Sequence, residues 1–133
     1  EMVMPINIDW DESEPTIIRS HMSGQWTWDE YNEASDIILE LARHIEGRVD
    51  LITEMASDSV FPKGSAQPHI TRLRRQRPDN FKLIVVVRPN AFTKMMIETV
   101  NRATKHSDDS IIVQSLEEAF EVIRKDREKD SEE

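Results

Sequence analysis

Two kinds of hydrophobic periodicity alternate along the chain, and together they predict alternating strands and helices. Residues 6–10 alternate apolar and polar side chains, which is typical of a short strand. The run LIVVV within residues 81–89 is continuous and β-branched, as in a central strand that is covered on both faces. Shorter runs predict the other strands. The predicted strands are residues 6–10, 16–26, 48–55, 81–89 and 110–114.

The segment GQWTWDEYNEA marks the start of the first predicted helix. Thr27 and Glu30 have the spacing of a capping box, in which each side chain accepts a hydrogen bond from the backbone of the other residue. Trp26 before the cap and Tyr31 after it match a hydrophobic staple. These roles favour a helix start and leave Trp28 partly exposed. An aromatic ligand box is the alternative interpretation.

Three further helices follow from similar signals. Residues 69–77 predict a short helix that ends before a proline. Residues 91–106 and 116–129 carry apolar side chains at helical spacing, as residues 31–45 do in the first helix. Gly47 is placed to cap the C-terminus of that first helix. The predicted N-terminal caps are Thr27, Asn90 and Ser115, the last paired with Glu118.

The resulting order, ββαβαβαβα, predicts an α/β layered fold. Strands that alternate with helices pair in parallel, because each helix carries the chain back across the sheet. The first two strands are joined by a short turn and should therefore pair antiparallel. We expect a five-stranded, mostly parallel sheet with one antiparallel edge strand and helices packed around it. Residues 1–133 should form a single domain, with its core over residues 5–124 and a charged tail over residues 125–133.

Composition narrows the class of protein. The absence of cysteine excludes disulfides, thiolate nucleophiles and cysteine-ligated zinc. The net charge of −9 argues against nucleic-acid binding, which needs surplus Lys and Arg to neutralise phosphates. No apolar run approaches the roughly 20 residues of a membrane helix, and no signal-peptide pattern is visible. We therefore expect a cytoplasmic protein that is not an integral membrane protein and does not bind nucleic acid.

The sequence lacks the motifs of the common catalytic and cofactor sites. Its three glycines lie far apart and cannot form a phosphate-binding loop. None of its four histidines lies at metal-ligand spacing from another, and no nucleophile elbow occurs. We therefore predict no cofactor, no metal and no catalytic residue. The alternative is a site in which His21 or His69 meets Glu54 or Asp58 near the end of a strand.

Arginines cluster in the short segment RLRRQR of this acidic chain. In a helix these side chains would point in most directions. One interpretation is a patch that binds an acidic protein face, phosphate groups or anionic lipid. The more common outcome is a solvated helix that pairs with the chain's own Asp and Glu residues. The candidate residues for the patch are Arg72, Arg74, Arg75 and Arg77.

Four segments, taken in order, resemble the SpoIIAA-like or STAS superfamily in its divergent STAS/SEC14-like branch. They are GQWTWDEYNEA, GRVDLITEM, FKLIVVVRPNAFTKMM and VQSLEEAFEVI, and they cover roughly residues 5–124. The resemblance implies a sheet with helices packed around it. It also implies a small regulatory or ligand-sensing module without catalysis of its own.

The resemblance implies two kinds of site. In bacterial anti-sigma factor antagonists of this superfamily, a partner kinase phosphorylates a serine after the strand that follows the first helix, and the new charge breaks a protein–protein contact. Ser57 and Ser59 occupy this position, although the usual Asp-Ser-Ser-Gly signature is missing and turn or capping roles are the alternative. The SEC14-like side implies a groove for an apolar or lipid ligand. The candidate lining residues are Met55, Phe61, Met95 and Met96.

The sequence thus predicts a non-catalytic regulatory or protein-interaction module of the STAS-like type, with a protein partner, a homodimer or both. The alternative is a binder of a small apolar or lipid ligand. An interaction module should expose apolar surface around the loop SVFP and contain no closed cavity. A ligand binder should enclose a pocket lined by Met and Phe. An enzyme should have a cleft in which a histidine and a carboxylate meet with perturbed pKa values.

Overall fold

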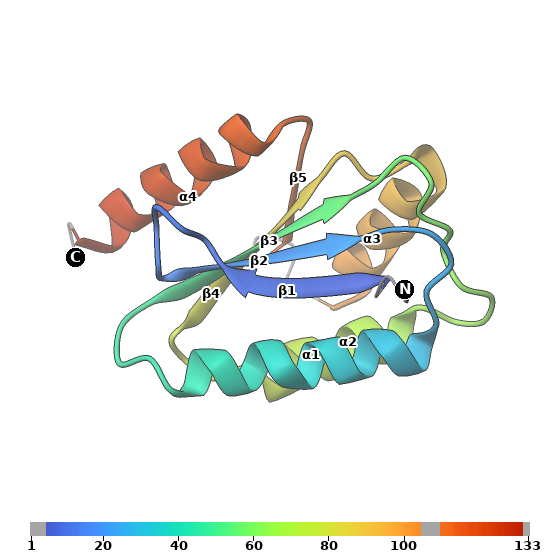
Figure 1. The fold of residues 1–133 in the computed structure, drawn as a ribbon, viewed down its shortest axis with the longest axis horizontal. Helices are drawn as coiled ribbons and strands as arrows, with labels where there is room; N and C mark the ends of the chain where they lie inside the picture. The colour runs from blue at the N-terminus through green and yellow to red at the C-terminus, as the bar shows by residue number, and fades with distance from the viewer. Residues whose placement is uncertain (1–4, 105–109, 132–133) are drawn as a thin grey trace.

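The computed structural model of the chain describes residues 5–104 and 110–131, and within them it contains five strands and four helices (Figure 1). The elements are β1 (Ile6–Trp10), β2 (Ile17–Met22), α1 (Trp28–Arg43), β3 (Val49–Met55), α2 (Gln67–Gln76), β4 (Phe81–Val87), α3 (Ala91–Thr104), β5 (Ser110–Val113) and α4 (Leu116–Ser131). The predicted order is confirmed. Helix α2 begins two residues earlier than predicted because Pro68 is accommodated in its first turn, where a missing N–H costs no hydrogen bond.

All five strands form one sheet in the order β1-β2-β3-β4-β5. Strands β1 and β2 pair antiparallel, and the other neighbours pair in parallel. Helices α1, α2 and α3 pack on one face of the sheet, while α4 packs alone on the other face (Figure 1). The predicted α/β layered fold with one antiparallel edge strand is therefore confirmed.

Alternating side chains of the central strands divide the interior into two cores. In β4, Ile84 and Val86 join the core under α1–α3, whereas Leu83, Val85 and Val87 join the core under α4. All five side chains are buried. Because helices cover both faces of this strand, no position faces solvent between Leu83 and Val87, which explains the uninterrupted apolar run.

The start of α1 has the predicted local structure. Thr27 Oγ1 accepts a hydrogen bond from the backbone N–H of Glu30 at 3.0 Å, and Glu30 Oε1 accepts one from the N–H of Thr27 at 3.0 Å. Trp26 stacks on Tyr31 with 5.9 Å between ring centres. The capping box and the staple are both confirmed, so this segment fixes where the helix begins and how the chain enters it.

The predicted cap at Gly47 is wrong. Helix α1 ends at Arg43 with His44 as its C-terminal cap, and Gly47 does not have the positive φ of a glycine cap. Instead, Asn80, which precedes β4, donates hydrogen bonds from its side-chain amide to carbonyl groups in the last turn and just after it. The acceptors are the carbonyl oxygens of Ala42, Ile45 and Gly47, each 2.9 Å from the amide nitrogen. A residue distant in sequence thus replaces the local cap.

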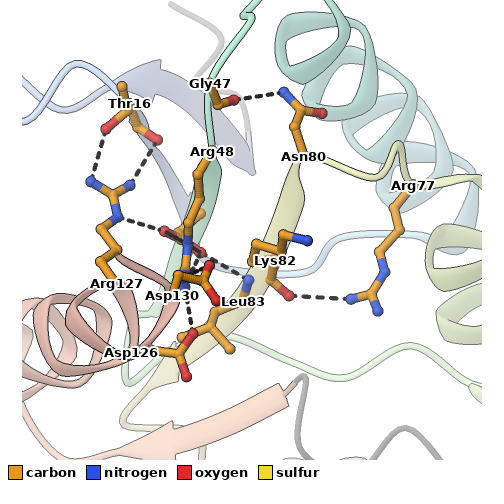
Figure 2. Close-up of polar contacts among 11 residues, drawn as sticks. Thr16, Gly47, Arg48, Arg77, Asn80, Lys82, Leu83, Asp126, Arg127 and Asp130 are labelled. Atoms are coloured by element: carbon orange, nitrogen blue, oxygen red, sulfur yellow. Dashed lines mark hydrogen bonds and ion pairs between the residues drawn. The ribbon is translucent and has the colours of Figure 1, made fainter. Parts of the chain in front are cut away.

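An ion-pair network centred on one buried carboxylate joins α4 to the amino end of the sheet (Figure 2). Asp50 on β3 is fully buried, and its carboxylate accepts hydrogen bonds from Arg48 Nε at 3.1 Å, Arg127 Nε at 2.9 Å and the backbone N–H of Leu83 at 2.9 Å. Arg48 also pairs with Asp126 at 2.7 Å. The first residues of the predicted charged tail therefore continue α4 and attach it to the sheet.

Candidate functional site

A cavity of about 100 Å³ lies between the sheet and helices α1–α3. Most of its wall is apolar and comes from strands β1–β4 and the three helices. Five serine and threonine residues also line it, and all five are buried. They are Ser20, Ser35, Thr53, Thr93 and Ser110. The cavity is therefore an apolar space with polar side chains in its wall, which is the general composition of small-ligand sites.

Aromatic side chains from two segments form one wall of the cavity. Trp26 and Trp28 both lie edge-on to Phe61, with ring centres 5.6 Å and 5.2 Å apart. Trp28 stacks on His69 with 4.6 Å between ring centres, and its Nε1 donates to the carbonyl of Lys63 at 3.1 Å. The tryptophans of GQWTWDEYNEA thus have packing roles and also line the cavity.

Among the described residues that line the cavity, Arg74 is the charged one, and it is itself buried. Its guanidinium donates hydrogen bonds to Ser110 Oγ at 2.7 Å and to Asn101 Oδ1. Burial raises the pKa of the Tyr31 hydroxyl to about 12, although the positive charge of Arg74 and the polar side chain of Ser35 act in the opposite direction. Tyr31 therefore lines the cavity as a neutral phenol at physiological pH.

Thr93 stands in the first turn of α3 and is 2% exposed. Its backbone N–H donates to the Oδ1 of the capping residue Asn90 at 2.8 Å. Ser35 and Thr99 each donate their hydroxyl to the carbonyl four residues earlier, at 2.8 Å in both cases. The hydroxyl of Thr93, in contrast, has no hydrogen-bond partner among the described residues. A buried polar group without a partner is uncommon and calls for an explanation.

Four apolar residues on two segments next to the aromatic wall, three of them about half exposed, are here named the apolar collar. It consists of Val60 and Phe61 in the loop after β3, and of Phe92 and Met95 on α3. The exposed fractions of Val60, Phe92 and Met95 are 49%, 53% and 51%. Phe61 contacts Phe92 edge-on with 5.6 Å between ring centres, and it also lines the cavity. Exposed apolar surface around SVFP and an internal cavity are therefore both present.

The two candidate phosphoacceptor serines have different surroundings. Ser57 is exposed in the loop after β3. Ser59 is buried, and its hydroxyl accepts a hydrogen bond from Trp26 Nε1 at 3.0 Å. Asp58 between them is exposed and accepts a hydrogen bond from the backbone N–H of Gly24 at 3.3 Å. Of the two hydroxyls, only that of Ser57 lies where an enzyme could reach it without opening the fold.

The four candidate arginines do not form one patch. Arg72 pairs with Asp36 on α1 at 2.8 Å, and Arg74 is buried beside the cavity. Arg75 is exposed, and Arg77 donates to a backbone carbonyl at 3.3 Å. The side chains therefore spread around α2 and meet different surroundings, and one of them contributes to the cavity rather than to the surface.

The candidate ligand-lining residues also separate. Met55 and Phe61 line the cavity. Met95 is half exposed and belongs to the apolar collar, while Met96 is partly buried outside the described lining of the cavity. Adjacent residues on a helix cannot share a narrow face, so the neighbours Met95 and Met96 could not both have pointed into one pocket.

The proposed meeting of a histidine with a carboxylate is not found among the described residues. His69 hydrogen-bonds the side chain of Asn32 at 3.1 Å and stacks on a tryptophan. His21 is exposed and lies opposite Glu54 in the register of β2 and β3, but Glu54 forms an ion pair with Arg19. In the same part of the chain, no group of three or more His, Asp and Glu side chains could hold a metal ion.

Comparisons of the chain with protein-family models, with curated proteins and with solved structures give no match. The fold and the geometry of the cavity and collar are therefore the basis for assigning a function. Over residues 5–104 and 110–131, none of the helices is both long enough and apolar enough to cross a membrane.

Proposed function

We propose that this chain is a non-catalytic regulatory module whose protein partner binds to the apolar collar. The exposure of the collar carries this proposal, since Val60, Phe92 and Met95 each expose about half of their surface. Single exposed apolar side chains are ordinary. Several exposed apolar side chains close together on a surface are typical of an interaction site. The contact between Phe61 and Phe92 joins the loop and the helix into one such group.

The position of the collar supports the same function. It lies beyond the carboxyl ends of β3 and β4, where open parallel sheets usually place their binding sites. The resemblance to the STAS superfamily also supports the proposal, because that resemblance implies a partner contact controlled by a serine in the loop after β3.

We extend the proposal to Ser57 as the regulatory phosphoacceptor. Ser57 is exposed and lies in the same loop as Val60, whereas Ser59 is buried under Trp26. A phosphate would place a charge of about −1.5 to −2 beside apolar surface that a partner must cover. Because desolvating that charge is unfavourable, phosphorylation of Ser57 should weaken binding of the partner.

Affinity capture with a matched set of variants tests the role of the collar. The test variant combines Phe92→Ser with Met95→Ser, and the control is Ile37→Ser, which changes an apolar side chain that is 51% exposed on α1. We expect a protein that co-purifies with the wild type and with the control to be lost from the test variant. Light scattering after gel filtration detects the case in which the partner is a second copy of the chain.

The proposal is wrong if the folded test variant keeps both the co-purifying proteins and the oligomeric state of the wild type. Circular dichroism of each variant establishes that the comparison is made between folded proteins. Replacing Ser57 by Glu and by Ala in the same capture experiment tests the phosphoacceptor separately, and only the Glu variant should lose the partner.

The cavity favours a second function, the binding of a small apolar ligand. Met55 and Phe61 line it, as expected for such a binder. Pockets for drug-sized molecules have volumes of roughly 300–1,000 Å³, so a lipid chain could enter this cavity of about 100 Å³ only if its walls moved. Native mass spectrometry of the protein purified from cells tests this function. An added mass that is lost on denaturation supports it, and a protein of unmodified mass rejects a tightly retained ligand such as a lipid.

A further inference from the structure

We propose that the cavity is a binding site for an uncharged molecule of roughly four non-hydrogen atoms with one hydrogen-bonding oxygen, such as a short-chain alcohol or ketone. This inference rests on the second proposed function, ligand binding in the cavity, and does not depend on the collar. The size of the cavity, the charges around it and the free hydroxyl of Thr93 lead to it in turn.

The volume of the cavity limits the size of the ligand. A cavity of about 150 Å³ in a protein core accommodates benzene, a ring of six carbon atoms. This cavity measures about 100 Å³, so the same packing leaves room for roughly four non-hydrogen atoms. The chain of a fatty acid is several times larger and does not fit the cavity in this shape.

The charges around the cavity favour a neutral ligand. Arg74 is the one charged side chain among the described lining residues, and its guanidinium already bonds Ser110 and Asn101. A cation would lie close to this positive charge, and none of the described lining residues is a carboxylate that could pair with it. An anion would have to give up its water and also compete with the existing contacts of Arg74. Burying an unpaired charge is unfavourable in both cases, whereas an uncharged molecule avoids this cost.

The hydroxyl of Thr93 provides an anchor for the oxygen of the ligand. Thr93 lines the cavity, is 2% exposed and has no hydrogen-bond partner among the described residues. A hydroxyl both donates and accepts, so it can pair with an alcohol or with a carbonyl group. A hydrocarbon would leave this group unpaired. Water would pair with it but would not pack against the apolar wall formed by side chains such as Ile84 and Val86.

Titrations followed by nuclear magnetic resonance of the isotope-labelled protein test the inference. The probes are 1-propanol, propionate and propylammonium, which share a three-carbon chain and differ in the charge of the head group, and laurate is the lipid probe. We expect saturable shifts of the cavity residues with 1-propanol alone. The dissociation constant should lie in the millimolar to high-micromolar range, because so few atoms limit the affinity.

Two variants connect binding to the cavity. Thr93→Val keeps the shape of the side chain and removes its hydroxyl, so it should weaken 1-propanol binding roughly threefold to tenfold. Ala34→Leu adds three carbon atoms to a lining residue on α1 and should abolish binding while the protein remains folded. The amide spectrum of each variant reports its fold in the same experiment.

The inference is overturned if 1-propanol gives no saturable shift, which would mean that the cavity does not take up a small neutral molecule of this kind. It is also overturned if either charged probe binds as tightly, if laurate binds and 1-propanol does not, or if Thr93→Val binds 1-propanol as tightly as the wild type. A negative titration together with an added mass in the native spectrum would reject the small neutral ligand but keep the ligand-binding function. Negative results in both experiments would reject both.

Discussion

Tyr31 belongs to several features of the molecule at once. It lies in the first turn of α1, its ring stacks on Trp26, and it lines the cavity. Burial disfavours the phenolate form of its hydroxyl, and this effect outweighs the favourable influence of Arg74 and Ser35 on that form. A single side chain therefore links the helix start to the electrostatics of the cavity.

Alkaline titration should show this link directly, because Tyr31 is the only tyrosine in the chain. We expect its phenolate absorbance to appear with a pKa of about 12 instead of the usual 10. Since the folded pKa lies above the unfolded one, the stabilising effect of the neutral phenol is complete below pH 10 and is lost as the pH rises toward 12, by roughly 3 kcal/mol. Tyr31→Phe should lack this part of the alkaline loss of stability. A phenolate pKa near 10 in the folded protein would contradict the prediction.

Individual residues differ in how far the sequence could predict their roles. Thr27 and Glu30 could be recognised because both partners of a capping box lie within one turn. Thr93 carried no such signal, since a hydroxyl residue in a first helical turn commonly serves the helix end, and the absence of a partner depends on the tertiary packing. For the same reason, the sequence did not distinguish the buried Arg74 from its exposed neighbour Arg75.

At the scale of elements, α4 shows how ion pairs of different burial act on one helix. Arg127 reaches the fully buried carboxylate of Asp50, whereas Arg124 pairs with Glu128 and Glu121 on the exposed side of α4. Exposed pairs contribute little because solvent screens them, while a buried carboxylate depends on its partners for compensation. The two arginines should therefore differ strongly in their effect on stability.

Urea unfolding of Arg127→Met and Arg124→Met tests this difference. We expect the first change to lower the free energy of unfolding by about 2 kcal/mol, because Asp50 stays buried with Arg48 as its remaining ion-pair partner. The second change should have an effect of at most about 0.5 kcal/mol. Equal effects of the two substitutions would show that the buried network does not attach α4 in the way described.

The elements themselves could be predicted well because their signals are periodic and local. The continuous run of β4 and the apolar spacing of α1 each contain enough positions to identify the element. The end of α1 could not be predicted, because the residue that satisfies its carbonyl groups, Asn80, follows 37 positions after Arg43 in the sequence. Gly47, which lies near the expected end, wrongly indicated a glycine cap at the C-terminus of α1.

At the scale of the whole molecule, two cores share one sheet. All three tryptophans belong to the core under α1–α3 or pack against it, whereas the core under α4 contains none of them. The strands between the cores contribute side chains to both, so neither core can lose its packing without disturbing the other. We therefore expect the chain to unfold as one cooperative unit.

Ile123→Ala in α4 tests this cooperativity. Ile123 is 1% exposed in the core that contains no tryptophan, and its truncation should cost about 2–5 kcal/mol. Tryptophan fluorescence and circular dichroism should report the same shifted transition. Ile37→Ala, at a half-exposed position, should leave both transitions nearly unchanged. A fluorescence transition that stays in place while the circular dichroism transition moves would show that the cores unfold separately.

The cavity beside the aromatic wall also affects how the molecule responds to hydrostatic pressure. A cavity of about 100 Å³ in each molecule corresponds to about 60 mL per mole, and the contraction of a protein on unfolding scales with the volume of such internal cavities. That volume lies within the range of roughly 20–100 mL per mole by which proteins contract on unfolding. Compression should therefore favour the unfolded chain, and a molecule seated in the space would oppose that contraction.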